Sequence, residues 1–262
     1  MGIFDSGIGG LTVAKAIHEN FPNENIVYFG DTAHLPYGDK SEAAIQAYSI
    51  RIADLLLKMG CKVIVIACNS ASSASYELLK EYVNKQAHVI NVIDPMVQFV
   101  SHSLADKRIG LIGTKRTVQS GIYQKKLAAI NPACTIHSLA TPLLAPMIEE
   151  GFYNSQISHE IVWNYLSDPI LQNIDALILA CTHYPLIRNE INEFYKGKVN
   201  ILDSTQIIVE SLMEYLTSHQ LFGTSQNSEL QFLVSDYTES FEASTQIFFQ
   251  EKVSLKWHPL WN

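Results

Sequence analysis

Two of the four cysteines in this 262-residue sequence stand at positions suited to proton transfer. Cys68 follows the apolar run Val63–Ala67, and Cys181 follows the apolar run Ala176–Ala180. Small polar residues and then a helical pattern come after each cysteine, so both thiols stand where a buried strand passes into a helix. A helix N-terminus lowers the pKa of a thiol from its ordinary value of ~8.5. We therefore expect both cysteines to be reactive.

Each of these cysteines has a candidate proton partner. Asp5 ends a neighbouring strand and is the candidate for Cys68, while His183 lies two residues beyond Cys181. If the two thiols face one pocket, one of them can remove a proton from carbon while the other returns a proton on the opposite face. This arrangement indicates racemisation or epimerisation of a small molecule.

Other kinds of cysteine chemistry fit the pattern less well. A zinc site is not expected, because the sequence has no C-x-x-C or H-x-x-x-H spacing. A cysteine hydrolase with Cys181 as nucleophile and a histidine as base is conceivable, but it leaves Cys68 without a role. Cys61 and Cys134 stand at strand entrances without such polar neighbours, and we interpret both as structural.

The two cysteines belong to a set of polar clusters that follow expected strands. The clusters are Asp5–Gly10, Gly30–Gly38, Cys68–Ser70 and Cys181–Pro185. In open α/β sheets ligands bind beyond the carboxyl ends of the strands, so we expect the clusters to form one site. The first is a glycine-rich loop whose N–H groups are placed to receive an anion such as a carboxylate. It is not a dinucleotide fingerprint, because Thr12 occupies the place of the third glycine.

The elements that must carry these clusters follow from an alternation of short β-branched runs with longer helical patterns. This alternation predicts an α/β fold with mostly parallel sheets flanked by helices. The clearest helix is expected at Ser41–Met59, ended by Gly60. The strands are expected at Gly2–Asp5, Ile26–Gly30, Val63–Ala67, His88–Ile93, Arg108–Ile112, Thr135–Leu139, Ala176–Ala180, Val199–Leu202 and Leu230–Val234.

The similar runs before Cys68 and Cys181 indicate two similar α/β domains, each with one cysteine, and a site in the cleft between them. The expected crossing points are Asp94-Pro95, where proline stops the preceding strand, and Asp203-Ser204, a strand exit with a helix N-cap signal. We therefore expect a discontinuous first domain of residues 1–94 and 204–262, and a second domain of residues 95–203.

Composition limits the classes of function. The 18 basic and 26 acidic residues give a net charge of −8 with no Lys/Arg run, so we expect neither nucleic acid nor a membrane surface as a partner. No apolar run approaches the ~18 residues of a membrane span, and the N-terminus lacks a secretory pattern. Four cysteines in such a chain indicate reduced thiols in a cytoplasmic protein. No lysine in the loop clusters has the neighbours of a Schiff-base lysine, so pyridoxal chemistry is not expected.

Taken together, these clusters closely resemble the motifs of the glutamate racemase family. Their combination and order are specific, and the domain pattern extends the resemblance to nearly the whole chain. The matching strings are Phe4–Val13, Gly30-Asp31-Thr32, Pro36-Tyr37-Gly38, Ala67-Cys68-Asn69, Gly113-Thr114 with Thr117, and Ala180–Pro185.

The resemblance implies an enzyme that works without a cofactor or metal and interconverts L- and D-glutamate with two cysteines as acid and base. Cys68 would handle the α-proton of D-glutamate with help from Asp5, and Cys181 that of L-glutamate with help from His183. Glu149 matches a further acidic residue, although Glu150 is adjacent. Contacts to the substrate would come from Ser6, Pro36, Tyr37, Gly38, Asn69, Ser70, Thr114, Thr117 and Thr182.

This chain departs from the family pattern at two places. Ser70 stands where Thr is common, and His34-Leu35 occupies a stretch where relatives often carry Arg. Because histidine titrates near neutral pH, the second change is expected to alter the salt or pH dependence. The resemblance also implies D-glutamate supply for peptidoglycan synthesis and a possible homodimer. The alternatives are an aspartate or hydantoin racemase and a catalytically idle binding protein for acidic amino acids.

Overall fold

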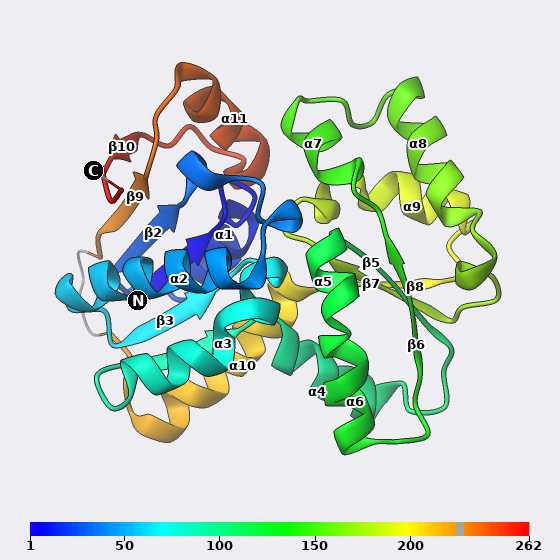
Figure 1. Ribbon diagram of the computed structural model, residues 1–262, viewed down its shortest axis with the longest axis horizontal. Helices are drawn as coiled ribbons and strands as arrows, with labels where there is room; N and C mark the ends of the chain where they lie inside the picture. The colour runs from blue at the N-terminus through cyan, green and yellow to red at the C-terminus, as the bar shows by residue number, and fades with distance from the viewer. Residues whose placement is uncertain (224–227, 262) are drawn as a thin grey trace.

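The computed structural model describes residues 1–223 and 228–261, and it consists of two lobes that each contain one parallel β-sheet (Figure 1). The first sheet has the strand order β10-β9-β2-β1-β3-β4 and the second has the order β6-β5-β7-β8. Every strand pair is parallel. The predicted α/β class with mostly parallel sheets is confirmed.

The strands of the first sheet come from both ends of the described chain, and those of the second come from its middle. The first sheet contains β1 (Gly2–Asp5), β2 (Ile26–Gly30), β3 (Val63–Ile66), β4 (His88–Asn91), β9 (Leu230–Val234) and β10 (Leu255–Trp257). The second contains β5 (Ile109–Gly113), β6 (Ile136–Ala140), β7 (Ala176–Ala180) and β8 (Asn200–Asp203).

Helices cover the faces of both sheets (Figure 1). The α-helices are α1 (Leu11–Asn20), α2 (Glu42–Lys58), α3 (Asn69–Val83), α4 (Ile93–Ser103), α5 (Lys115–Ser120), α6 (Ile122–Ile130), α7 (Leu144–Glu149), α8 (Gln156–Leu166), α9 (Arg188–Phe194), α10 (Ser204–His219) and α11 (Glu239–Phe249). Short 3₁₀ turns are η1 (Thr32–His34), η2 (Tyr37–Asp39), η3 (Pro169–Leu171) and η4 (Tyr184–Ile187).

The central strands are buried along their whole length because helices pack on both of their faces. All residues of β1, β3, β5 and β7 are buried. The predicted helix at residues 41–59 is confirmed as α2, with the Ser41 side chain accepting a hydrogen bond from the Ala44 N–H. Gly60 follows with a φ of 77°, a left-handed conformation that glycine adopts without a side-chain clash.

The predicted strand His88–Ile93 is too long, because a helix begins at its end. The Oδ1 atom of Asn91 accepts hydrogen bonds from the N–H groups of Ile93 and Asp94, both at 2.8 Å, and this starts α4. Pro95 therefore lies in the first turn of a helix, where its missing N–H costs no intrahelical bond. Strand β10, at the edge of the first sheet, was not predicted, and it has only three residues.

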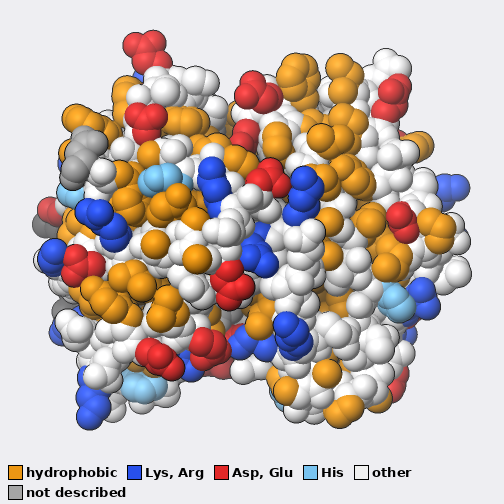
Figure 2. All heavy atoms as spheres, viewed as in Figure 1, with side chains coloured by type: hydrophobic (Ala, Val, Ile, Leu, Met, Phe, Trp, Pro, Cys, Tyr) orange, Lys and Arg blue, Asp and Glu red, His pale blue; other side chains and the backbone are white. Residues whose placement is uncertain are grey.

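The chain passes from the first sheet to the second through α4 and returns through α10. These two helices pack against each other. The space-filling view shows a notch between the lobes and a surface on which acidic and basic side chains are interspersed (Figure 2). The predicted domain boundaries at residues 94–95 and 203–204 stay a prediction, and the first of them falls inside α4. Among the described residues, no helix is both long and apolar enough to cross a bilayer.

Candidate active site

A small pocket lies between the two sheets and has a volume of about 30 Å³. It contains both candidate cysteines and most of the other side chains that the sequence pointed to. Its lining comprises Ser6, Pro36, Tyr37, Gly38, Cys68, Asn69, Ser70, Thr114, Ala145, Glu149, Ala180, Cys181, Thr182 and His183. Of the predicted site residues, only Asp5 and Thr117 lie outside this lining, and both are buried directly behind it.

Cys68 lies at the N-cap of α3, at the end of the central strand β3. Its Sγ atom accepts a hydrogen bond from the Ala71 N–H at 3.4 Å and lies 3.8 Å from the Ser6 hydroxyl oxygen. Burial raises the pKa of the Cys68 thiol to about 12, and the charge of Asp5 acts in the same direction. The expectation that the helix start lowers this pKa is therefore wrong. The single amide contact does not offset the loss of solvent around a thiol that is 5% exposed.

Asp5 is fully buried and shapes the glycine-rich loop. Its Oδ2 atom accepts hydrogen bonds from the N–H groups of Gly7 and Gly10, at 3.2 and 3.0 Å. These two amides are thus occupied by a side chain of the protein, whereas the sequence suggested that they receive a ligand anion. Burial raises the pKa of Asp5, although His183 and the two amides oppose the rise. Asp5 is therefore a protonatable carboxyl group beside Cys68.

Cys181 has a different partner arrangement. Its Sγ atom lies 3.5 Å from Nδ1 of His183, and Nε2 of His183 donates to Oε1 of Glu149 at 2.8 Å. Burial lowers the pKa of His183, but Cys181 and Glu149 outweigh this and hold the pKa well above its ordinary value. The two ring nitrogens of His183 thus face a thiol and a carboxyl group. Of the two adjacent glutamates, Glu149 faces this histidine, whereas Glu150 is exposed.

Two consecutive glycines allow the loop after β1 to approach both partner groups. A Cβ atom at Gly9 would overlap the imidazole ring of His183, with Nδ1 only 2.6 Å away. A Cβ atom at Gly10 would lie 2.5 Å from the Cβ of Asp5. Any side chain at these positions would displace one of the two groups, so the glycines have separate structural roles in the two halves of the site.

Neutral polar side chains from both sheets complete the pocket. The Tyr123 hydroxyl donates to Oδ1 of Asn69 at 2.7 Å, and Nδ2 of Asn69 is buried without a hydrogen-bond partner in the described chain. The Ser70 and Thr114 hydroxyl oxygens lie 2.8 Å apart, and Thr114 donates to Thr117 at 3.1 Å. Asn69 thus offers a free donor at the pocket wall, while Thr117 is hydrogen-bonded to Thr114 behind that wall.

Tyr123 and Ala145 belong to the site region but were not predicted from the sequence. Tyr123 lies on α6 in the second lobe, 54 residues from the asparagine that it contacts. The segment around it has only a helical pattern, which carries no sign of a contact across the lobes. Ala145 is a small apolar residue on α7 and has no chemical signature in sequence.

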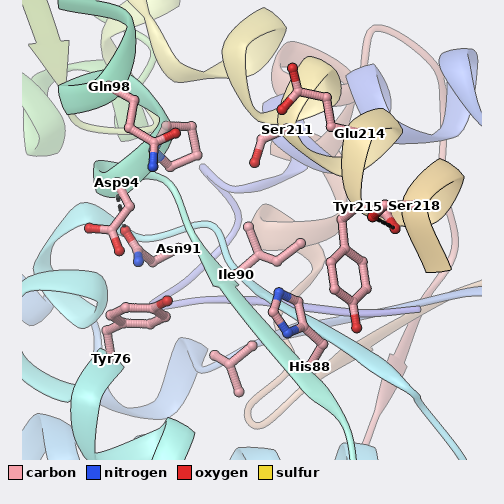
Figure 3. Close-up of a pocket in the computed structure, with 12 residues that line it drawn as sticks. Tyr76, His88, Ile90, Asn91, Asp94, Gln98, Ser211, Glu214, Tyr215 and Ser218 are labelled. Carbon is pink, nitrogen blue, oxygen red and sulfur yellow. Dashed lines mark hydrogen bonds between the residues drawn. The ribbon is translucent and has the colours of Figure 1, made fainter. Parts of the chain in front are cut away.

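A larger cavity elsewhere in the molecule lacks this chemistry. It has a volume of about 430 Å³ and lies where β4, α4 and α10 meet (Figure 3). His88, Asp94, Glu214 and Tyr215 are among its lining residues, but it contains no thiol. In the described part of the chain, no group of three or more His, Cys, Asp or Glu side chains is arranged to hold a metal ion. The chemistry is therefore concentrated in the smaller pocket.

The sequence of this chain is similar to those of known racemases. The Asp/Glu/hydantoin racemase family model matches residues 10–212. A glutamate racemase from Caldanaerobacter subterraneus is 37% identical over 97% of this chain and 92% of its own length. A glutamate racemase from Aquifex pyrophilus is 42% identical over 89% of this chain and 92% of its own length.

Solved structures show the same similarity. Glutamate racemase from Francisella tularensis in complex with D-glutamate has a TM-score of 0.92 and 36% identity, covering 99% of this chain and 97% of its own. The Thermus thermophilus enzyme has a TM-score of 0.87 and 34% identity, covering 98% and 95%. With two thiols in one pocket and these similarities over nearly its whole length, the chain belongs to the Asp/Glu/hydantoin racemase family and is an isomerase.

Proposed function

We propose that this enzyme interconverts L- and D-glutamate by a two-cysteine acid/base mechanism without a cofactor. The observation that carries the proposal is that Cys68 and Cys181 line one buried pocket and that each has its own protonatable partner. The full-length similarity to glutamate racemases supports glutamate as the substrate. We likewise infer the catalytic and substrate-binding roles of the residues that line this pocket.

In the direction from L-glutamate, Cys181 acts as the base and Cys68 as the acid. Nδ1 of His183 is within reach of the Cys181 thiol and can exchange a proton with it, and Glu149 holds the imidazole in place. Cys68, with a pKa of about 12, is a neutral thiol at neutral pH and can deliver its proton to the opposite face. This protonation state of Cys68 suits the direction from L-glutamate.

In the direction from D-glutamate the roles are exchanged, so Cys68 must first lose its proton. A raised thiol pKa makes this step costly, at ~1.4 kcal/mol for each pKa unit. The ammonium group of a bound amino acid would oppose the rise, because a nearby positive charge favours the thiolate. Asp5, the buried carboxyl group beside Cys68, has a raised pKa and can take the proton that the thiol gives up.

Removal of an α-proton also requires stabilisation of the negative charge that develops on the carbon and carboxylate. Fixed donors aimed at the carboxylate supply this stabilisation in a pocket that excludes water. The free Nδ2 of Asn69 and the hydroxyl groups of Ser70, Thr114 and Thr182 are the available donors in the lining. We infer that they bind the substrate carboxylates together with Ser6 and the Pro36-Tyr37-Gly38 loop.

The wider assignments follow from the same function. We infer a cytoplasmic enzyme that supplies D-glutamate for peptidoglycan synthesis, with glutamate as its small-molecule partner and a homodimer as a possible assembly. We further infer that residues 1–94 and 204–262 form one domain and residues 95–203 the other. The distribution of strands between the two sheets supports this division.

The test is circular dichroism of the purified enzyme with L-glutamate and separately with D-glutamate, without added cofactor. We expect both optical signals to decay to zero, because the enantiomers have equal free energy in water. L- and D-aspartate serve as the specificity control and should react much more slowly. A glutamate signal that never decays, or faster decay with aspartate, would contradict the proposal.

A further inference from the structure

We propose that Asp31 is a positioning residue for the substrate loop Leu35–Gly38 and that Trp261 completes its hold on that loop. The inference deepens the proposed glutamate racemase function and rests on it. The elements involved are Asp31, His34, Tyr37, Ser235 and Trp261, which we call the Asp31 cluster. Apart from Tyr37, none of these residues lines the pocket with the two thiols.

Asp31 follows β2 and is a fully buried carboxylate with side-chain donors on both oxygens. Its Oδ1 atom accepts hydrogen bonds at 2.7 Å from the Ser235 hydroxyl and from the indole N–H of Trp261. Its Oδ2 atom accepts from the Tyr37 hydroxyl at 2.6 Å and lies 3.0 Å from Nδ1 of His34. Oδ1 therefore faces the body of the first lobe, with Nδ1 of His34 also 3.2 Å away, whereas Oδ2 faces the loop.

The loop side of the cluster determines where Tyr37 lies. Its hydroxyl is engaged with Asp31, so this residue contributes its ring and backbone to the pocket wall. The adjacent Gly38 packs closely on the second lobe, because a Cβ atom there would lie 2.9 Å from the Cβ of Thr114. A shift of Tyr37 would consequently move the wall beside Thr114, one of the proposed carboxylate contacts.

The frame side depends on residues far away in the sequence. Ser235 follows β9, and its hydroxyl also accepts a hydrogen bond from the Ala33 N–H at 3.0 Å. Trp261 lies 230 residues from Asp31 and packs edge-on against His34, with ring centroids 4.6 Å apart. The indole therefore packs against the residue that precedes the loop and supplies one of the donors to the carboxylate that anchors the loop.

The burial of Asp31 makes each donor consequential. A carboxylate removed from water is costly unless hydrogen bonds replace its hydration. Within residues 1–223 and 228–261, no Lys or Arg side chain forms an ion pair with Asp31. Loss of the Trp261 donor should loosen the whole cluster, including its bond to Tyr37. Because neither thiol nor its partner is touched, we expect weaker substrate binding with an almost unchanged chemical step.

The test compares Trp261→Phe with Trp257→Phe in the complete chain. Phenylalanine at 261 keeps an aromatic ring but removes the indole donor. Trp257 is the matched control, because its indole N–H donates to the Ser235 backbone carbonyl at 3.2 Å and not to Asp31. We measure kcat and KM for both enantiomers, together with amide hydrogen exchange of residues 32–40 without substrate.

We expect Trp261→Phe to raise KM for both enantiomers by about threefold to tenfold, with kcat within about twofold of the original. Hydrogen exchange of residues 32–40 should become faster, and Trp257→Phe should change neither quantity. Tyr37→Phe removes the bond at the other end of the cluster, so its effect on KM should be similar, and combining it with Trp261→Phe should add little.

Three outcomes would overturn the proposal. These are an unchanged KM in Trp261→Phe, an equal rise of KM in the Trp257→Phe control, and faster exchange of the loop without any change in KM. If the original enzyme did not racemise glutamate, the proposed function would fail by that result alone. The hydrogen-exchange comparison, which needs no substrate, would then still decide whether Trp261 holds the loop.

Discussion

The two thiols of this enzyme would perform mirror-image proton transfers, yet their surroundings are not alike. Cys68 is paired with the buried carboxyl group of Asp5, which accepts two loop amides. Cys181 is paired with an imidazole that is itself held by Glu149. A chain of L-amino acids cannot build two mirror-image half-sites. Equivalent proton transfers are therefore obtained here with a carboxyl group beside one thiol and an imidazole beside the other.

The difference between the two thiol environments cannot be seen in kcat/KM. Because the equilibrium constant between enantiomers is one, kcat/KM must be equal in the two directions for the enzyme and for every variant. We call Cys68 with Asp5 one half-site and Cys181 with His183 the other. A substitution in one half-site therefore lowers kcat/KM equally for both enantiomers. The two half-sites can be distinguished only by kcat and KM separately, by isotope effects and by pH dependence.

The largest effect is expected when either thiol is removed. Cys68→Ala and Cys181→Ala should each reduce racemisation in both directions by about 10³-fold or more, because each direction needs one acid and one base. The double variant should be little worse than either single one. Circular dichroism with both enantiomers measures the loss. Cys61→Ala, a buried cysteine outside the pocket, is the control. Full activity in either site variant would contradict the two-thiol mechanism.

The next largest effect should come from the partner groups. His183→Asn should lower kcat/KM by about 10²-fold and make proton transfer at Cys181 limiting. The isotope effect of α-deuterated substrate should then rise with L-glutamate and fall with D-glutamate. Asp5→Asn should produce the opposite change, because it weakens the Cys68 side. A shift in the same direction in both variants would show that the partners do not serve separate thiols.

A smaller effect is expected at the glycine pair. Gly9→Ala crowds His183 and Gly10→Ala crowds Asp5, so each should reproduce the isotope pattern of its own half-site with a loss of about tenfold. Gly7→Ala is the matched control, because its Cβ would lie 3.6 Å from Leu35, an ordinary contact distance. It should be affected least. Equal losses in all three variants would mean that the loop tolerates no side chain for general reasons.

The smallest effect is a shift of the pH profile. Burial and the Asp5 charge both raise the pKa of Cys68, so Asp5→Asn should lower that pKa. Cys68 must be ionised to accept a proton from D-glutamate and protonated to donate one to the intermediate from L-glutamate. The acid limb of kcat with D-glutamate and the alkaline limb with L-glutamate should therefore both move to lower pH. If neither limb of the pH profile of kcat moves, Asp5 does not influence the pKa of Cys68.

Sequence reasoning was sufficient for local features. The bounds of β1, β2, β7 and β9 agree with the predicted strands because each is an apolar run between turn residues. The polar clusters converge because parallel strands bring their carboxyl ends to one edge. The direction of the Cys68 pKa shift was predicted wrongly, since it depends on packing that removes solvent from that thiol.

Features that depend on long-range contacts were also not predicted. Tyr123 on Asn69 and Trp261 on Asp31 join residues 54 and 230 positions apart, and neither pair has a spacing that a motif could reveal. The start of α4 at Ile93 depends on the Asn91 side chain, which competes locally with continuation of the strand. These differences arise where a side chain, rather than a backbone pattern, decides the structure.

The small volume of the pocket determines how turnover must proceed. A cavity needs ~10–15 Å³ to hold one water molecule, so about 30 Å³ leaves no room for an amino acid between the closed walls. We therefore expect the two lobes to part and to return in each catalytic cycle. Such a motion works against solvent friction, so kcat should fall as the microviscosity of the medium rises. In variants with slow proton transfer, kcat should no longer depend on viscosity. Proton transfer, and not the opening that releases the product, then limits the rate.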